Sequence, residues 1–395
     1  MSWPQVKLES VFDIARGGSP RPIDDYITDD DDGLNWISIK DASNSDKYIT
    51  TTKLKIKPEG LSKTRLVKPG DFLLTNSMSF GRPYIMKTTG CIHDGWLVLS
   101  GNPEIADSDY FYHLLGSEHL KRRFSALAAG AVVKNLNIDL VKGVEIPLPP
   151  LAEQKRIAAI LDKADAVRRK RQQAIQLADD FLRAVFLEMF GDPVTNPKGF
   201  RKGAITELAD VITGQAFKSD EYIGDSDAAV RLCRGTNTLT GYFDWSDTAY
   251  WPEDKLEGLE KYLISDGDVI LAMDRPWISS GLKVCIFSPG ERSTYLVQRV
   301  ARLRPKNKIF SDYIYSCVKS DAFERHCCPT ETTIPHISPV ELRGFEVLIP
   351  KESAIANYHE VVSKVRAGMK YMQDSSVSAN DVFSSLSQRA FSGRL

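Results

Sequence analysis

The chain contains one sequence pattern twice, and this internal repeat constrains the fold more than any other feature. Residues 143–149 (GVEIPLP) match residues 344–350 (GFEVLIP). Earlier in each half, residues 70–74 (GDFLL) match residues 267–271 (GDVIL), and the letters SDYFY recur as SDYIY. Because the matches keep their order and a nearly constant spacing, they indicate a duplicated domain.

A long amphipathic pattern follows each copy of the repeat. From Ile157 and from Ile355 onward, apolar residues recur at alternating steps of four and three, which is typical of a coiled-coil seam. Two equivalent copies can be related by a local twofold axis, so we expect the two helices to pair in antiparallel orientation. The predicted core of this helix pair comprises Leu161, Ala164, Ile175, Leu182, Val185, Val362, Val365, Met369, Phe383 and Leu386.

These patterns divide the chain into four segments of a mixed α/β fold. Residues 1–150 and 192–350 are expected to form two α/β domains, and residues 151–191 and 351–395 two long helices. Pro150 before the first helix and Gly191 after it are typical helix boundaries. The expected strands cover residues 36–39, 71–75, 96–100, 144–147, 268–272, 282–287 and 345–349, and the expected shorter helices cover residues 108–126 and 311–326.

Composition argues against several classes of protein. The net charge of −1 is unlike that of a generally basic nucleic-acid-binding domain, so any such surface has to be a local patch. The six cysteines lack CxxC spacing, and the acidic residues 29–32 lack the glycine turn of a calcium loop, so we expect no bound metal. The opening MSWPQVKLES has no signal-peptide core, and no apolar run is long enough to span a bilayer. We therefore expect a cytoplasmic protein.

Four segments together carry a resemblance to a known family. They are IPLPPLAEQKRIAAILDKADAVRRK from residue 146, FLRAVFLEMFGDP from residue 181, TTIPHISPVELRGFEVLIP from residue 332 and the terminal SLSQRAFSGRL. They closely resemble the specificity subunits of Type I restriction-modification systems, and the resemblance covers the whole chain. One departure is the opening of the second long helix, ESAIANYHEVVSK, which lacks the EQKRI run of the first.

The resemblance implies a non-catalytic subunit with two target-recognition domains, at residues 1–150 and 192–350. Each domain would read one half of a bipartite, asymmetric DNA site, and the helix pair would set the spacing between the halves. The helices would also dock two adenine-methylating modification subunits, and restriction subunits would join that complex. S-adenosylmethionine, ATP and Mg²⁺ would then belong to the partner subunits, with no cofactor on this chain.

The candidate DNA contacts lie in loops near the matched strands, because loops on a rigid scaffold commonly carry recognition. Arginine can pair with guanine and asparagine with adenine, whereas an aromatic ring can pack on sugars or unstacked bases. The candidates are Ser19, Arg21, Lys40, Asn76, Ser77, Arg82, Lys134, Asn135, Gln215, Lys218, Arg234, Thr236, Asn237, Arg275, Trp277, Thr333 and His336. Ordinary surface loops would explain the same residues, and Arg168 and Arg171 on the helix seam could face partner subunits, phosphates or nearby acids.

Three other classes of protein are alternatives to a specificity subunit: a DNA methyltransferase, a nuclease and a coiled-coil scaffold. A self-contained DNA methyltransferase would need a glycine-rich cofactor loop and an Asn/Asp-Pro-Pro-aromatic motif, which Asn196-Pro197-Lys198 does not supply. A metal-dependent nuclease could use Asp244 or Asp247 with Glu253 and Lys255, although the first copy has no such set. A coiled-coil scaffold without DNA readout would need the helix seam alone.

Overall fold

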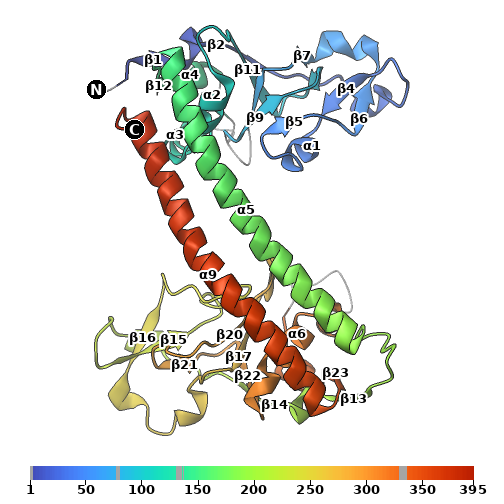
Figure 1. Cartoon of the computed structure of the whole chain (residues 1–395), viewed down its shortest axis with the longest axis vertical. Helices are drawn as coiled ribbons and strands as arrows, with labels where there is room; N and C mark the ends of the chain where they lie inside the picture. Colours follow the sequence, from blue (N-terminus) through green and yellow to red (C-terminus); the bar gives the residue numbers. More distant parts are fainter. Residues whose placement is uncertain (1–2, 77–80, 130–135, 137, 329–335) are drawn as a thin grey trace. The chain divides into compact units, whose positions relative to one another are not determined.

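The computed structural model describes residues 3–76, 81–129, 136, 138–328 and 336–395, except for the side chains of residues 128–129 and 370–379. The chain forms two compact units (Figure 1). Unit 1 comprises Met1–Gln173 together with Gln373–Leu395, and unit 2 comprises Ala174–Met372. Each unit therefore contains one α/β domain and a part of each long helix.

Unit 1 is built on two five-stranded sheets. The first has the order β2 (Phe12–Arg16), β11 (Trp96–Gly101), β8 (Phe72–Thr75), β9 (Pro83–Met86) and β5 (Tyr48–Ile49). The second has the order β3 (Ile27–Thr28), β6 (Leu54–Ile56), β4 (Leu34–Ile37), β10 (Gly90–Ile92) and β7 (Arg65–Val67). A separate antiparallel pair joins β1 (Gln5–Lys7) to β12 (Glu145–Pro147), and the helices are α1 (Ile39–Ser43), α2 (Ser108–Leu115), α3 (Glu118–Ala129) and α4 (Ile138–Lys142).

Unit 2 repeats this plan with fewer strands. Its main sheet has the order β14 (Ala209–Thr213), β22 (Val300–Pro305), β17 (Val269–Ala272) and β20 (Val284–Ile286). A smaller sheet contains β16 (Ala249–Pro252), β15 (Ala229–Cys233) and β21 (Thr294–Leu296). It also contains two strand pairs, β13 (Arg201–Ala204) with β23 (Glu346–Ile349) and β18 (Trp277–Ile278) with β19 (Gly281–Leu282). Its helices are α6 (Ser311–Val318), α7 (Asp321–Cys327) and α8 (Pro339–Gly344).

The repeated sequence motifs make equivalent contacts in the two units. The hydroxyl of Tyr110 donates to the carbonyl of Pro147 over 2.9 Å, and the hydroxyl of Tyr313 donates to that of Leu348 over 2.7 Å. A parallel strand pair also occurs in the second sheet of unit 1, β4 with β10, and in the smaller sheet of unit 2, β15 with β21. The SDYFY and SDYIY motifs therefore tie the helix after the main sheet to the last strand of each domain.

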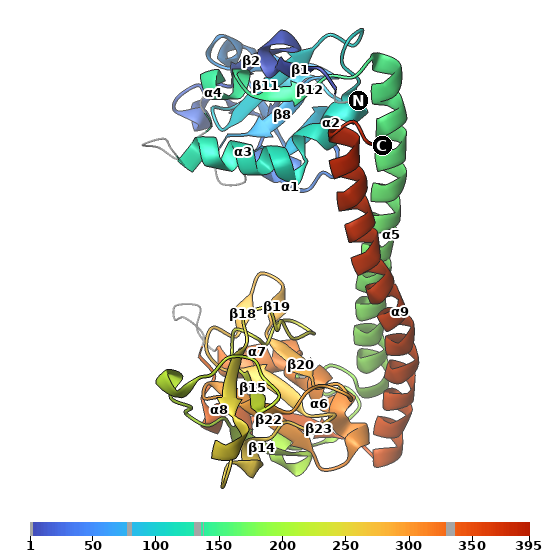
Figure 2. The same ribbon diagram turned by 90° about the vertical axis from the view of Figure 1, so that its left-hand side faces the viewer.

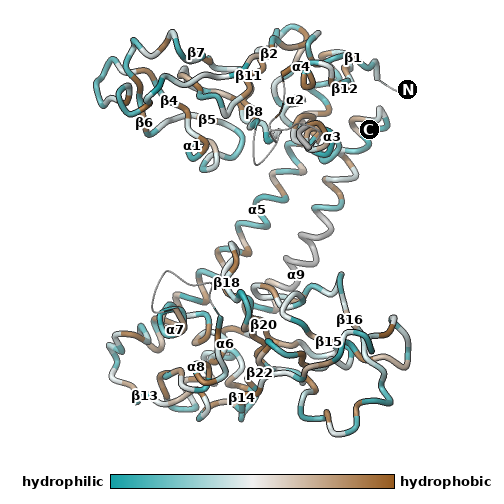
Figure 3. The backbone as a smooth tube through the Cα atoms, turned by 180° about the vertical axis from the view of Figure 1, so that it is seen from behind, coloured by the Kyte–Doolittle hydropathy of each residue, from teal (hydrophilic) through white to brown (hydrophobic). Residues whose placement is uncertain are grey.

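The repeated Gly-Asp pair forms the turn that leads into the central strand. Gly70 and Gly267 have φ angles of +96° and +86°, a conformation that favours glycine. The carboxylate of Asp71 accepts from the backbone N–H of Lys68 over 2.9 Å, as that of Asp268 does from Ser265 over 2.7 Å. The four residues of β8 and the four of β17 are buried. Figure 3 shows the hydropathy of each described residue along the backbone. The motif thus sets the start of each core strand.

The two long helices contribute to both hydrophobic cores. They are α5 (Leu151–Phe190) and α9 (Glu352–Phe391). In unit 1 the first part of α5 lies beside the last part of α9 (Figures 1 and 2), where Ile157 and Leu161 are buried in one cluster with Phe383 and Leu386. In unit 2, Phe186 and Phe190 of α5 contact Tyr358 of α9, with ring centroids 5.8 and 5.5 Å apart. Of the predicted helix-pair core, Leu161, Val362 and Met369 are buried, and the other seven residues are half-buried.

The EQKRI run has a structural role at the start of α5. Gln154 is fully buried, and its amide nitrogen donates to the carbonyls of Ile105 and Pro149, both over 2.9 Å. Its amide oxygen accepts from the backbone N–H of Asp107, which caps α2. This side chain therefore holds the first turn of α5 against α2 in unit 1.

Several predicted element boundaries were wrong for local reasons. The predicted helices 108–126 and 311–326 are each two helices, because the chain breaks at Gly116-Ser117 and at Lys319-Ser320. The strand predicted at 36–39 ends at Ile37, because Ser38 and Asp41 form a capping box that starts α1. The strand predicted at 282–287 is divided between β19 and β20. Within the described part of the chain, no helix has the length and apolar character needed to cross a membrane.

Candidate nucleic-acid interface

Three loops of unit 1 meet at one end of its main sheet. They are residues 16–21 after β2, the turn 93–95 between β10 and β11, and the loop that begins at Asn76 after β8. Backbone hydrogen bonds join them: Gly17 donates to Trp96 over 3.0 Å, Gly18 to Ile92 over 3.1 Å, and Asn76 to Gly95 over 3.1 Å. We call these three loops the loop cluster of unit 1.

Unit 2 contains an equivalent loop cluster. It consists of residues 214–218 after β14, the turn 297–299 between β21 and β22, and residues 273–277 after β17. Gly214 donates to Val300 over 3.0 Å, Gln215 to Leu296 over 2.9 Å, and Met273 to Arg299 over 2.9 Å. The same three connections of the fold are therefore held together in both units.

The glycines of these loops serve close packing. A Cβ atom at Gly17 would lie 2.1 Å from the carbonyl oxygen of His93, and one at Gly214 would lie 2.2 Å from that of Val297. No side chain fits at such distances, so glycine is required for one loop to pass over the next. The structure therefore gives these glycines an internal packing role.

Asp94 organises the loop cluster of unit 1. Its carboxylate accepts a hydrogen bond from the hydroxyl of Ser19 over 3.2 Å and lies 3.5 Å from the guanidinium of Arg21. Its backbone carbonyl accepts from Nε of Arg16 over 2.8 Å. The side chain of Arg21 is 81% exposed, so two predicted contact residues, Ser19 and Arg21, are held together at the surface.

A shallow hollow beside Arg21 is lined by Ser19, Trp36 and His93. The ring of His93 lies between Trp36 and Trp96, with centroids 6.1 and 6.0 Å away. Burial lowers the pKa of His93, and the charge of Asp94 opposes this shift. Because Nδ1 of His93 accepts from the backbone N–H of Gly95 over 2.9 Å, the neutral ring carries its proton on Nε2. The hollow thus combines aromatic rings with the polar groups of Ser19, Arg21 and His93.

Asp274 has the corresponding role in the loop cluster of unit 2. Its carboxylate accepts from Nη1 of Arg299 over 2.9 Å and lies 3.8 Å from Nδ1 of His336. The next residue, Arg275, is exposed. Beneath them, Nζ of Lys283 donates to the carbonyl of Gly235 over 3.1 Å, which brings the loop at residues 234–237 to the same place.

The other predicted contacts differ in how exposed their side chains are. Lys40, Thr236 and Lys218 are exposed, and Arg82 is exposed with its guanidinium 5.1 Å from the ring centre of Tyr84. Gln215 and Trp277 are half-buried, and Arg234 is held by the carboxylate of Asp247 at 3.1 Å. Ser77, Lys134, Asn135 and Thr333 lie outside the described residues.

Two predicted contacts, Asn76 and Asn237, are structural residues in this fold. Each is 1% exposed. The amide of Asn76 donates to the carbonyl of Asp94 over 2.7 Å, and that of Asn237 donates to the carbonyls of Asp244 and Asp247. A buried amide that is already bonded to the backbone has no free edge for adenine, so in this structure neither side chain is placed for base contact.

The two turns at the centres of the clusters were not among the predicted contacts. They contain His93 and Asp94 in unit 1 and Arg299 in unit 2. A signal was available in unit 1, because the turn directly precedes the predicted strand 96–100 and carries His-Asp-Gly. In unit 2, Arg299 lies at the equivalent position but has no motif of its own. Its place becomes visible when strands β21 and β22 are matched to β10 and β11.

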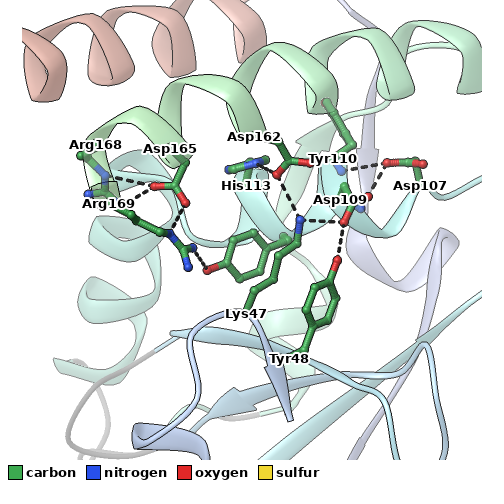
Figure 4. A network of polar contacts seen from close by, with 11 residues as sticks. Lys47, Tyr48, Asp107, Asp109, Tyr110, His113, Asp162, Asp165, Arg168 and Arg169 are labelled. Carbon is green, nitrogen blue, oxygen red and sulfur yellow. Dashed lines mark hydrogen bonds and ion pairs between the residues drawn. The ribbon is translucent and has the colours of Figure 1, made fainter. Parts of the chain in front are cut away.

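A polar network joins α2 to α5 in unit 1 (Figure 4). Nζ of Lys47 contacts Asp109 at 2.6 Å and Asp162 at 3.1 Å, and Nε2 of His113 lies 2.8 Å from Asp162. Burial alone would lower the pKa of Lys47, but its hydrogen bonds to the two aspartates raise that pKa above its usual value. Arg168 pairs with Asp165 and lies 5.1 Å from the ring centre of Phe383. The network therefore fixes the helices of unit 1, and an acid nearby is the observed partner of Arg168.

The side chains needed for a nuclease do not gather. Lys255 pairs with Glu221 at 2.9 Å, and Asp247 pairs with Arg234. Across the described ranges, no group of three or more His, Cys, Asp or Glu side chains is placed to hold a metal ion. The residues that a nuclease would use thus pair with different side chains and do not form one site.

Comparisons with known proteins agree with this architecture. A family model described as the Type I restriction modification DNA specificity domain matches residues 2–177. The Type I restriction enzyme MjaVIII specificity subunit of Methanocaldococcus jannaschii is 25% identical over 365 residues, which cover 88% of this chain and 82% of the relative. The Type I restriction enzyme EcoKI specificity subunit of Escherichia coli is 22% identical, and the match covers 100% of this chain and 89% of the relative.

A solved structure shows the same fold. The S subunit of a Type I restriction-modification system from M. genitalium superposes with a TM-score of 0.55 at 15% identity. The match covers 99% of this chain and 96% of the solved one.

Proposed function

The chain belongs to the specificity subunits of Type I restriction-modification systems, and we propose that each compact unit reads one half of a bipartite DNA site. Specificity subunits are the non-catalytic members of these systems. The observation that carries the proposal is the pair of loop clusters, which use the same three connections of the fold and present different side chains. Different side chains in equivalent places predict half-sites of different sequence.

The charges of the loop clusters suit contact with DNA. Arg16 and Arg21 lie around Asp94 in unit 1, and Arg275, Arg299 and His336 surround Asp274 in unit 2. Since the whole chain carries a net charge of −1, these basic side chains form local patches. In such a patch, arginines can contact phosphates for positioning and base edges for sequence readout. The partly buried aspartates keep the cations in place between binding events.

We further propose that α5 and α9 pair as an antiparallel coiled coil with a pseudo-twofold repeat. Two contacts within unit 1 support this: Arg156 of α5 donates to Leu395 after α9, and Arg168 further along α5 contacts Phe383 earlier on α9. Contacts in opposite order are typical of antiparallel helices. In this proposal the helix pair sets the number of base pairs between the half-sites.

The same helices are proposed to dock two modification subunits. Leu177, Phe181 and Leu187 of α5 are 60%, 52% and 42% exposed, which leaves apolar surface for partner subunits. Restriction subunits complete the proposed complex. In this proposal S-adenosylmethionine, ATP and Mg²⁺ belong to these partners, and the complex acts on DNA in the cytoplasm.

Methylation mapping tests the proposal directly. The chain is co-expressed with its modification subunit in cells that lack other adenine methylation, and methylated adenines are mapped across the genome. We expect one interrupted motif. Replacing residues 1–145 with the first domain of another specificity subunit should change one half of that motif. A change in both halves, or a continuous motif, would contradict separate reading by the two units.

A further inference from the structure

Two arginines in the loop cluster of unit 2 have a backbone conformation that side chains rarely adopt. Among the described residues, the non-glycine residues with positive φ are Asn196 at 46°, Arg275 at 45° and Arg299 at 64°. Left-handed conformations cost free energy for residues other than glycine, so they persist where the surrounding structure enforces them. That two of the three lie at one end of one sheet points to a role for these two arginines.

Arg299 is held to the neighbouring loop by both its backbone and its side chain. Its carbonyl accepts from the N–H of Met273 over 2.9 Å, and its Nη1 donates to Asp274 over 2.9 Å. The side chain is nevertheless 67% exposed. Within the described part of the chain, Asp274 is the residue to which its guanidinium hydrogen-bonds, which leaves other N–H groups of the guanidinium available to a ligand.

The surroundings of Arg299 are cationic. Arg275 is exposed next to Asp274, and His336 lies on the other side of that carboxylate. Lys283 lies below the loop, and burial lowers its pKa, with Asp274 opposing and Arg275 assisting this shift. Asp274 is therefore a single carboxylate among several basic groups. Such a site favours an anionic ligand with hydrogen-bond acceptors, as in the groove of DNA.

We propose that Arg299 reads a guanine in the half-site bound by unit 2, with Asp274 as the positioning residue. The planar guanidinium can donate two parallel hydrogen bonds to O6 and N7 of guanine in the major groove. A carboxylate that already holds the fork reduces the side-chain entropy lost on binding. This assignment rests on the proposed function and adds to it the kind of base that one half-site contains.

The geometry distinguishes base readout from a simple phosphate contact. A phosphate contact needs a positive charge near the backbone, and a flexible lysine or arginine can provide it. A base contact needs a fork in one orientation, and Arg299 has both a constrained backbone and a fixed carboxylate partner. In unit 1 the turn residue equivalent to Arg299 is Gly95, so the two half-sites cannot be read in the same way at this position.

The test uses the full chain in complex with its modification subunit. The half-site that stays unchanged when residues 1–145 are exchanged is assigned to unit 2. Fluorescence anisotropy then gives dissociation constants for the cognate duplex and for duplexes with each base pair of that half-site substituted. The variants are Arg299→Ala, Arg299→Lys and Asp274→Asn. The control is Arg201→Ala. Arg201 is 61% exposed and pairs with Glu207, and it lies on β13, which precedes the start of β14, whereas the loop cluster follows the end of β14.

Arg299→Ala should reduce discrimination at one G·C pair by roughly 5- to 150-fold and leave discrimination at the other pairs unchanged. Arg299→Lys should not restore it, because an ammonium group cannot form the fork. Asp274→Asn should reduce discrimination at the same pair by a smaller factor, and the control should change none. Because discrimination is a ratio at one base pair, a general loss of folded protein does not produce this pattern.

Three results would overturn the assignment while leaving the proposed function intact. The half-site of unit 2 could contain no G·C pair. Arg299→Ala could weaken binding to all duplexes by the same factor, or Arg299→Lys could behave like the wild type, and either result would indicate a phosphate contact. By contrast, a wild-type complex with no interrupted motif would contradict the proposed function itself.

Discussion

Phe190→Ala is expected to loosen unit 2 and leave the core of unit 1 unchanged. Phe190 is the last residue of α5 and is fully buried. Its ring centroid lies 4.8 Å from that of Tyr313, 5.3 Å from that of Phe186 and 5.5 Å from that of Tyr358. These rings come from α5, α6 and α9, so one side chain joins three helices within this unit.

The expected magnitude follows from the burial and the ring contacts. Truncating a buried phenylalanine to alanine destabilises a protein by about 3–5 kcal/mol, because apolar contact is lost and a cavity remains. Edge-to-face ring pairs add roughly 0.5–1.5 kcal/mol each beyond their buried area. We therefore expect a loss of about 4 kcal/mol in the free energy of opening of unit 2.

Hydrogen exchange resolved by peptide measures this effect, because it reports on each unit separately. A loss of about 4 kcal/mol corresponds to roughly 1000-fold faster exchange for amides that exchange through opening of unit 2. The peptides of α6 and β23 should show it, whereas those of β8 and β11 in unit 1 should not. Leu187→Ala is the matched control, because Leu187 lies on the same helix and is 42% exposed.

Two results would refute this reasoning. Acceleration below about tenfold in α6 would mean that the aromatic cluster contributes little to unit 2. Equal acceleration in both units would mean that the units do not open separately. In either case the division of the hydrophobic core between the units would need revision.

Further predictions concern pH, buried amides and helix length. Burial lowers the pKa of the His113 imidazole, so the stability that the neutral ring contributes is complete above the ordinary pKa of histidine and is lost as pH falls below that value. In thermal unfolding, the melting temperature of the His113→Gln variant should therefore fall less between pH 7.5 and pH 5.5 than that of the control variant His119→Gln, which changes an exposed residue. Asn76→Ala should destabilise unit 1 by about 1–3 kcal/mol, measured by urea unfolding, and leave the methylated motif unchanged; an altered motif would restore a reading role for this residue. Four residues inserted after Ala174 should lengthen α5 by about 6 Å and widen the spacer of the methylated motif by one or two base pairs at about 3.4 Å each. An unchanged spacer in an assembled complex would contradict the proposal that the helix pair sets the distance between the half-sites.

Local patterns predicted the parts of the fold that depend on local physics. The long helices follow from apolar residues at steps of four and three, and α5 begins at Leu151 and ends at Phe190, within one residue of the predicted segment. The Gly-Asp segments were found as a repeated motif, and the structure shows that each forms a turn in which Gly70 and Gly267 have positive φ. Helix breaks at Ser117 and Ser320 were missed, because a single serine inside an amphipathic pattern gives a weak signal.

The candidate interface was predicted as a set of loops but not as a site. Arg21 and Arg275 were chosen from loops near the matched strands and His336 from the segment before one, and the structure places each beside Asp94 or Asp274. Asn76 and Asn237 carry the same residue type that reads adenine, yet both are buried. Residue type states what a side chain can bind, whereas burial decides whether it is free to do so.

By itself the sequence indicated the duplication, the two long helices and the resemblance to the family, because repeats, periodicity and motifs are properties of neighbouring residues. Only the tertiary structure decided which loops meet. Asp274 and Arg299 belong to loops after different strands, and antiparallel pairing of β17 with β22 brings them to within 2.9 Å of each other. The same pairing constrains the backbone of Arg299 and leaves its side chain exposed. Contacts of this kind depend on strand register and sheet order, which no local pattern in the chain specifies.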